Sequence, residues 1–212
     1  MSLGSLYLCT PDRHDLATFI PGCVRGGVDV VQLREKQLPR EALLERASLA
    51  GRLCRELGVP FILNDDPAGA LECGADGVHV GQDDMDPAAA RRIVGDERLI
   101  GRSTHALAEL ERAMDEPVDY VSVGPVVPTP TKPGRPGTGL SYVTEAARLI
   151  ALRRPGLPFY VTGDARPETV GEMVAAGARR VVAVRYLTGS SDPEEAARRL
   201  RRALESAIAR ET

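Results

Sequence analysis

Charged and polar side chains follow an apolar run at residues 32–36, whose sequence is QLREK. In an extended chain alternate side chains share a side, so Gln32, Arg34 and Lys36 are expected to point the same way. Two neighbouring cations are stabilised by an anion, and the planar guanidinium suits phosphate. The alternative is a solvated strand end whose charges form outward ion pairs. We favour the anion site, because the ends of buried strands usually carry valine or isoleucine.

Acidic residues follow the next two apolar runs, as NDD at 64–66 and GQDD at 81–84. Mg²⁺ is commonly held by one or two protein carboxylates together with substrate phosphates. Asp65 and Asp84 are therefore the predicted metal ligands, next to the predicted anion site. The remaining acids in these segments are better explained as helix caps or surface residues: Asp66, Asp83 and Asp86.

Two later segments also carry polar groups. Thr129, Thr131 and Lys132 place two hydroxyls and a cation in a proline-rich stretch, which suits a phosphate or a polar heterocycle. Ser103 and His105 follow another apolar run. The alternative for Ser103 and its neighbour Thr104 is a structural role as caps of a helix that starts near Ala106. A lone histidine is more often structural than catalytic, so the role of His105 stays open.

These residues need a framework that brings several strand ends to one face. Eight short apolar runs alternate with helix-like stretches, and such runs are typical of parallel strands buried on both faces. The predicted strands are 6–10, 28–35, 60–64, 77–80, 99–103, 120–124, 158–163 and 180–184. Four helices are predicted to begin at Pro39, Asp86-Pro87, Pro167 and Asp192-Pro193. Glycines mark three predicted helix ends: Gly58, Gly74 and Gly177.

The alternation predicts a single (β/α)8 barrel domain over residues 1–212. An open doubly wound sheet is the second choice. It is the weaker one because the eight units include no G-x-G-x-x-G turn. In a barrel, side chains at the carboxyl ends of the strands do the chemistry, and the loops after the last two strands often bind phosphate. The proline- and glycine-rich stretch at 124–139 is expected to be a long loop at that face.

The composition sets the class of protein. The chain has 43% hydrophobic and 27% charged residues and a net charge of −3, so disorder and a broad nucleic-acid surface are not expected. Its four cysteines are widely spaced, without a C-x-x-C pair. No apolar run approaches membrane length, and the first residues lack a signal-peptide pattern. We therefore expect a cytoplasmic protein.

Several motifs together resemble the thiamine phosphate synthase family, and the likeness runs essentially from end to end. They are VVQLREK (30–36), ILND (62–65), GADGVHVGQDD (74–84), IGRSTH (100–105) and DYVSVGPVVPTPTK (119–132). The resemblance implies a (β/α)8 barrel that joins hydroxymethylpyrimidine diphosphate to a thiazole phosphate. The implied reaction is dissociative, depends on Mg²⁺ and releases diphosphate.

The resemblance also implies roles for individual residues. Those that match positions holding the pyrimidine diphosphate are Gln32, Arg34, Lys36, Asn64, Ser103 and Lys132. Arg34, Lys36 and Lys132 would act on the leaving diphosphate, and Asp65 and Asp84 match the Mg²⁺ ligands. Those near the thiazole phosphate are Thr129, Thr131, Gly163, Val184 and Arg185.

The chain departs from the family pattern after the seventh strand and around the eighth. Thr162-Gly163-Asp164 replaces two glycines and an apolar residue, and Arg179-Arg180 replaces Asp-Gly. Arg185 replaces a serine, so it can add a charged contact, fill the site or pair with Asp164. Two alternatives stay open: a thiazole tautomerase, which uses a histidine, and a non-catalytic sensor of phosphorylated ligands. Barrels of this size often form homodimers, which we note as an expectation.

Overall fold

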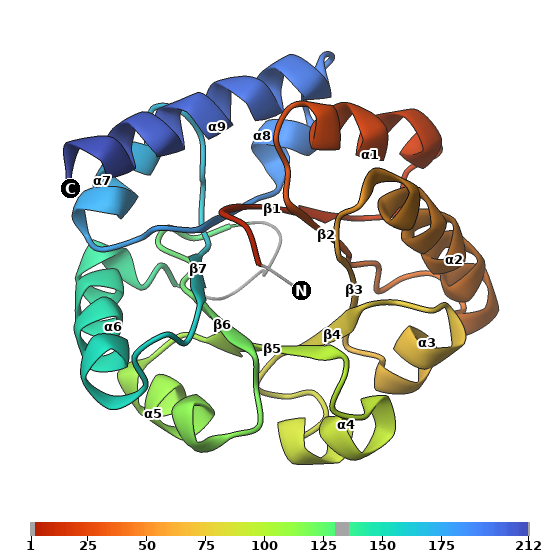
Figure 1. Cartoon of the computed structure of the whole chain (residues 1–212), viewed down its shortest axis with the longest axis horizontal. Helices are drawn as coiled ribbons and strands as arrows, with labels where there is room; N and C mark the ends of the chain where they lie inside the picture. The colour runs from red at the N-terminus through yellow and green to blue at the C-terminus, as the bar shows by residue number, and fades with distance from the viewer. Residues whose placement is uncertain (1–2, 130–135, 212) are drawn as a thin grey trace.

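Eight parallel strands close into a barrel in chain order, with β1 paired to β8 (Figure 1). The computed structural model describes residues 3–129 and 136–211. The strands are β1 (Leu6–Thr10), β2 (Val30–Leu33), β3 (Phe61–Asn64), β4 (Gly77–Val80), β5 (Leu99–Thr104), β6 (Tyr120–Val123), β7 (Phe159–Val161) and β8 (Val181–Ala183). Seven of the predicted apolar runs contain one of these strands, and β5 extends one residue beyond the predicted run at 99–103. The predicted (β/α)8 barrel is confirmed.

The helices form a ring around the barrel, and α9 lies across α1 and α7 (Figure 1). They are α1 (Leu16–Arg25), α2 (Arg40–Leu57), α3 (Pro67–Glu72), α4 (Pro87–Val94), α5 (Leu107–Asp115), α6 (Gly139–Arg153), α7 (Val170–Ala175), α8 (Arg185–Thr188) and α9 (Pro193–Arg210). Outward strand residues such as Val78 and Val80 join their apolar faces in one core. Among the helices described, none combines the length and the apolar character needed to cross a membrane.

Aspartate caps begin three of these helices. Asp66 accepts a hydrogen bond from the Gly69 N–H at 2.8 Å, which supports its assignment as a cap rather than a ligand. Asp86 and Asp192 cap α4 and α9 in the same way. The predicted start of α7 at Pro167 is wrong, because the helix begins at Val170. The Thr169 hydroxyl donates to the Asp164 carbonyl at 2.6 Å and holds the preceding residues in turns.

The inward side chains of the barrel form two levels. At the lower level, Tyr7, Tyr120 and Tyr160 pack with ring centroids 5.1–6.0 Å apart. Val30 and Ile62 complete this buried cluster, and Leu3 packs against it. The level above, nearer the carboxyl ends of the strands, carries mostly polar side chains. The tyrosines therefore close the barrel interior beneath any ligand that enters from that end.

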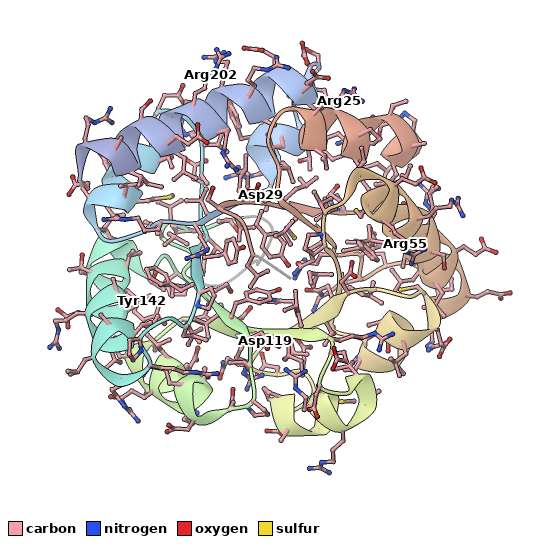
Figure 2. The ribbon with its side chains drawn as sticks, viewed as in Figure 1. Arg25, Asp29, Arg55, Asp119, Tyr142 and Arg202 are labelled. Carbon is pink, nitrogen blue, oxygen red and sulfur yellow. The ribbon has the colours of Figure 1, made fainter. Side chains whose placement is uncertain are left out.

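Three aspartates hold the opposite end of the barrel, each placed directly before an even-numbered strand. The carboxylate of Asp29 accepts the N–H groups of Ser5 and Leu6 at 2.7 and 3.0 Å. Asp76 accepts the N–H of the first residue of β3, Phe61, and Asp119 accepts that of the second residue of β5, Ile100. Asp29 and Asp119 lie on opposite sides of the barrel in Figure 2. These bonds satisfy strand-end donors that have no ladder partner.

We predict that Asp29→Ala lowers the free energy of unfolding by about 2 kcal/mol, since it leaves part-buried donors unsatisfied. The same carboxylate lies 2.5 Å from Arg201 of α9, so its loss also leaves that cation without this partner. Urea denaturation followed by circular dichroism measures the change. Asp96→Ala, at an exposed position, is the control and should leave the midpoint within error. Equal midpoints for both variants would contradict the prediction.

Candidate active site

A cavity opens at the carboxyl end of the barrel. It is lined by inward side chains that lie on each of the eight strands or directly after them: Cys9, Gln32, Asn64, His79, Ser103, Ser122, Thr162 and Val184. Gln32, Asn64, His79, Ser103 and Ser122 are all buried. A buried polar side chain must be hydrogen-bonded, so this level is built to make specific polar contacts.

One side of the cavity carries the predicted anion-binding residues. Gln32, Arg34 and Lys36 all line it, as the alternation predicted, although β2 itself ends at Leu33. Glu35 points elsewhere, because its carboxylate accepts the N–H groups of neighbouring loop residues. Within the described residues, the Arg34 guanidinium makes no hydrogen bond or ion pair. A cation that lines a cavity without a carboxylate partner is suited to an anionic ligand.

The two predicted metal ligands lie beside this group. Asp65 is 2.7 Å from the Lys36 ammonium, and Asp84 is close enough to interact with Asp65 directly. Burial raises the pKa of Asp65, the Lys36 ammonium opposes this shift, and the Asp84 carboxylate raises the pKa further. Two carboxylates that repel each other form a site that a cation stabilises.

The backbone holds these carboxylates in place. Asp65 adopts a left-handed conformation with φ 67°, which aspartate tolerates better than most residues. Its N–H donates to the carbonyl of His79 at 2.9 Å, which ties the turn after β3 to β4. Asp84 accepts the Gly81 N–H at 2.8 Å. The Arg102 guanidinium in turn donates to the Gly81 carbonyl at 2.5 Å.

Arg102 supports this loop, and the sequence analysis did not select it. Its side chain is buried and lies 3.3 Å from the Glu116 carboxylate. A charged residue inside an apolar strand was the signal that was available. We describe Arg102 as a positioning residue, because it contacts the loop that carries Asp84 rather than the cavity.

The other side of the cavity is formed by the loops after β6, β7 and β8. Thr129, Gly163, Val184 and Arg185 line it, as the resemblance implied. Gly163 has φ 105°, and a Cβ there would lie 2.4 Å from the Val126 nitrogen, so the close approach of these two loops requires glycine. Thr131 and Lys132 lie outside the described residues.

Two of the residues that depart from the family pattern, Asp164 and Arg185, contact each other. Asp164, with φ 64°, pairs with Arg166 at 2.9 Å and with Arg185 at 3.8 Å. The ion pair between Asp164 and Arg185 was one of the three outcomes considered. Arg185 lies after the eighth strand, since β8 stops at Ala183 and Arg185 is the first residue of α8.

His105 is not among the described residues that line the cavity. Its Nδ1 lies 2.5 Å from the carbonyl oxygen of Gly124, and its N–H donates to Glu109. This geometry favours a structural role and gives no support to a tautomerase that uses this histidine. The alternative that Ser103 and Thr104 cap a helix is wrong, because both belong to β5 and α5 begins at Leu107.

The most extensive polar feature of the site was not predicted. His79 hydrogen-bonds both Ser103, at 2.9 Å, and Tyr120, at 3.1 Å. Tyr120 contacts the hydroxyl of Tyr7, which accepts from Gln32. The alternation that placed Gln32 inside the barrel applies equally to GVHV at 77–80, and would have placed His79 inside it.

The profile of the family described as thiamine monophosphate synthase matches residues 6–187. A thiamine-phosphate synthase of Mycolicibacterium smegmatis is 45% identical over 96% of this chain and 93% of its own. One from Thermus thermophilus is 48% identical, over 95% and 98%.

A solved structure agrees in fold. Thiamine phosphate pyrophosphorylase from Pyrococcus furiosus superposes with a TM-score of 0.84 at 24% identity, over 96% of both chains. At that identity the likeness establishes the barrel alone. The family profile and the two curated relatives cover nearly the whole chain, so this barrel belongs to the thiamine monophosphate synthase family.

Proposed function

We propose that this chain is a thiamine-phosphate synthase that transfers the pyrimidinylmethyl group of hydroxymethylpyrimidine diphosphate to a thiazole phosphate. One observation carries the proposal: the cations Arg34 and Lys36 and the carboxylates Asp65 and Asp84 line one cavity. Cations beside a carboxylate pair suit a diphosphate that is bound together with a metal. Membership of the family supplies the chemical identity of the two substrates.

The pyrimidine diphosphate is assigned to the side of the cavity at the carboxyl ends of β2, β3 and β5. Gln32, Asn64 and Ser103 are buried there and suit the polar ring. Arg34 and Lys36 lie past the end of β2, nearer the opening, and suit the diphosphate. Lys132 is assigned to the same diphosphate on the family motif.

The metal is proposed to be Mg²⁺, held by Asp65 and Asp84. The donor set fits, since both ligands are carboxylates and Mg²⁺ completes its shell with water and substrate phosphate. When bound, the ion would neutralise part of the charge on the leaving diphosphate. The Lys36 ammonium, 2.7 Å from Asp65, keeps that carboxylate oriented and lies where it can also contact the diphosphate.

The thiazole phosphate is assigned to the loops after β6, β7 and β8. Thr129 and Thr131 supply hydroxyls for this substrate, the second on the family motif. Gly163 brings backbone to the cavity without a side chain, and Arg185 adds a cation next to Val184. In the first step of the reaction, the C–O bond between the methylene carbon and the diphosphate breaks, and the diphosphate leaves with the electron pair. The thiazole nitrogen then forms a bond to the resulting methylene carbon.

The protein's contribution to this step is electrostatic and positional. Arg34, Lys36 and Lys132 stabilise negative charge that grows on the leaving oxygen, which lowers the barrier. The buried polar level holds the pyrimidine ring so that its methylene faces the second substrate. No proton transfer at carbon is needed.

Two further expectations remain predictions. The four cysteines are free and buried, which suits a reducing compartment such as the cytoplasm. Assembly into a homodimer is the second, and size-exclusion chromatography with light scattering measures it directly.

Release of diphosphate tests the proposed function. Purified protein is incubated with Mg²⁺, hydroxymethylpyrimidine diphosphate and thiazole phosphate, and each component is omitted in turn. We expect release only with all three, with thiamine phosphate as the product. Binding of the pyrimidine diphosphate without release would instead indicate a sensor or a different acceptor.

Asp65→Asn and Asp84→Asn are each expected to lower turnover at least about 100-fold, since each removes a charged ligand next to the leaving group. Both should also raise the Mg²⁺ concentration that gives half-maximal rate. Asp86→Asn is the matched control, because asparagine also caps a helix and Asp86 caps α4. An unchanged Mg²⁺ dependence in both cavity variants would contradict the metal assignment.

Arg34→Ala and Lys132→Ala are expected to lower turnover by two or more orders of magnitude, as for the loss of one contact to developing charge. Circular dichroism should show an unchanged fold in both. Arg52→Ala, at an exposed position on α2, serves as the control for loss of a cation. Wild-type turnover in Arg34→Ala or Lys132→Ala would show that the diphosphate is bound elsewhere.

A further inference from the structure

We propose that a buried ion pair on the outer side of the barrel wall, Arg102 with Glu116, sets the metal affinity of the site by holding the turn that carries Asp84. Over residues 3–129 and 136–211, neither member of the pair lines the cavity. The pair therefore acts through the backbone of the turn, and both members are positioning residues. The inference rests on the proposed function for the identity of the metal.

The turn from Gly81 to Asp84 follows β4 and closes on itself. The Gly81 N–H donates to the Asp84 carboxylate at 2.8 Å, and the Asp84 N–H donates back to the Gly81 carbonyl at 3.4 Å. A Cβ on Gly81 would lie 2.8 Å from the Asp84 carboxylate, so glycine permits this closure. The position of the carboxylate therefore depends on the position of the Gly81 backbone.

Arg102 is bonded to this turn from the neighbouring strand. Its guanidinium donates to the Gly81 carbonyl, the same oxygen that accepts the Asp84 N–H. A charged donor makes a stronger hydrogen bond than a neutral one, so Arg102 makes the stronger of the two bonds to that oxygen. The side-chain amide of Gln82 donates to the Ser103 carbonyl at 2.6 Å. The turn is thus tied to β5 at two points.

The place of Arg102 in the sheet is one that an apolar residue would normally fill. Arg102 lies in register between Val80 of β4 and Val121 of β6, which are fully buried in the core outside the strands. Its side chain is 9% exposed, and the Glu116 carboxylate lies 3.3 Å away. In the part of the chain that the structure describes, Arg102 Nε and Glu116 Oε2 are buried and have no hydrogen-bond partner.

A buried ion pair with this geometry is a poor source of stability. Removing two charges from water has a large free-energy cost, and apolar side chains in their place are often neutral or stabilising. Arg102 makes a bond to a backbone carbonyl that an apolar side chain could not make. The pair therefore serves the placement of the turn, and Glu116 compensates the charge that Arg102 brings into the core.

The turn needs support because its carboxylate is repelled by a neighbour. The Asp65 and Asp84 carboxylates interact directly, and each disfavours the charge on the other. Before a cation binds, this repulsion tends to move the turn away from Asp65. A turn that had to be ordered on binding would lower the affinity for the metal, whereas a turn that is already held does not.

The first test replaces the pair by apolar side chains, Arg102→Met together with Glu116→Leu, so that no single charge is left buried. Mn²⁺ with inorganic diphosphate is the probe, and electron paramagnetic resonance measures free Mn²⁺. We expect the half-saturating Mn²⁺ concentration to rise about tenfold, as for the loss of one hydrogen bond. The urea midpoint should equal or exceed that of wild type. Arg102→Lys, which keeps the charge and a donor, should recover part of the affinity.

Arg98→Met is the matched control. Arg98 also donates to backbone carbonyls, those of Ala75 and Val94, but at the amino end of the same two strands. We expect wild-type Mn²⁺ affinity in this variant. Unchanged or tighter Mn²⁺ binding in the double variant of Arg102 and Glu116 would overturn the inference, because removal of a cation without loss of positioning favours the metal.

Amide hydrogen exchange without metal tests the support itself. Exchange at the Gly81 and Asp84 N–H groups should be about tenfold faster in the double variant and unchanged in Arg98→Met. Wild-type exchange in the double variant would overturn the inference. Absence of Mn²⁺ binding in wild type would contradict the metal assignment of the proposed function and the inference with it. Binding that the double variant leaves unaffected would overturn the inference alone.

Discussion

The closed barrel must be filled from within, and the three tyrosines that fill it determine where the site lies. Tyr7, Tyr120 and Tyr160 are fully or almost fully buried and occupy the interior that the strands enclose. Because strand side chains alternate, the next inward position on each strand lies one level higher, where the interior opens to the cavity. The tyrosine hydroxyls face a polar environment at that boundary, so apolar packing and ligand recognition meet in the same side chains.

The aspartates at the amino end of the barrel stabilise the fold, whereas those at the carboxyl end line the cavity. At the amino end, Asp29, Asp76 and Asp119 accept strand N–H groups, which satisfies the backbone and fixes the strands. At the carboxyl end, Asp65 and Asp84 face each other and a lysine across a cavity. Aspartate therefore satisfies backbone donors at the amino end, and at the carboxyl end two aspartate carboxylates repel each other. The Lys36 ammonium, 2.7 Å from Asp65, offsets part of this repulsion.

Among the described residues, the non-glycine positions with positive φ are Asp65 and Asp164, and both line the cavity. Each turns the chain sharply after a strand and so presents a carboxylate at the rim of the site. Asp65 faces a lysine, whereas Asp164 pairs with Arg166 and Arg185. Two departures from the family pattern, Asp164 and Arg185, thus belong to one connected group of ion pairs beside the loops that follow β7 and β8.

The sequence determined the features that depend on neighbours along the chain. The period of the apolar runs specified eight strands, alternation placed Gln32, Arg34 and Lys36 on one side, and an aspartate before a proline marked the caps at Asp66 and Asp86. Short-range rules suffice there because each partner lies within a few residues. Only the tertiary structure joined Tyr7 to Tyr120 and His79 to Ser103, across 113 and 24 residues. Such contacts depend on the stagger between strands in the closed barrel, which no local pattern encodes.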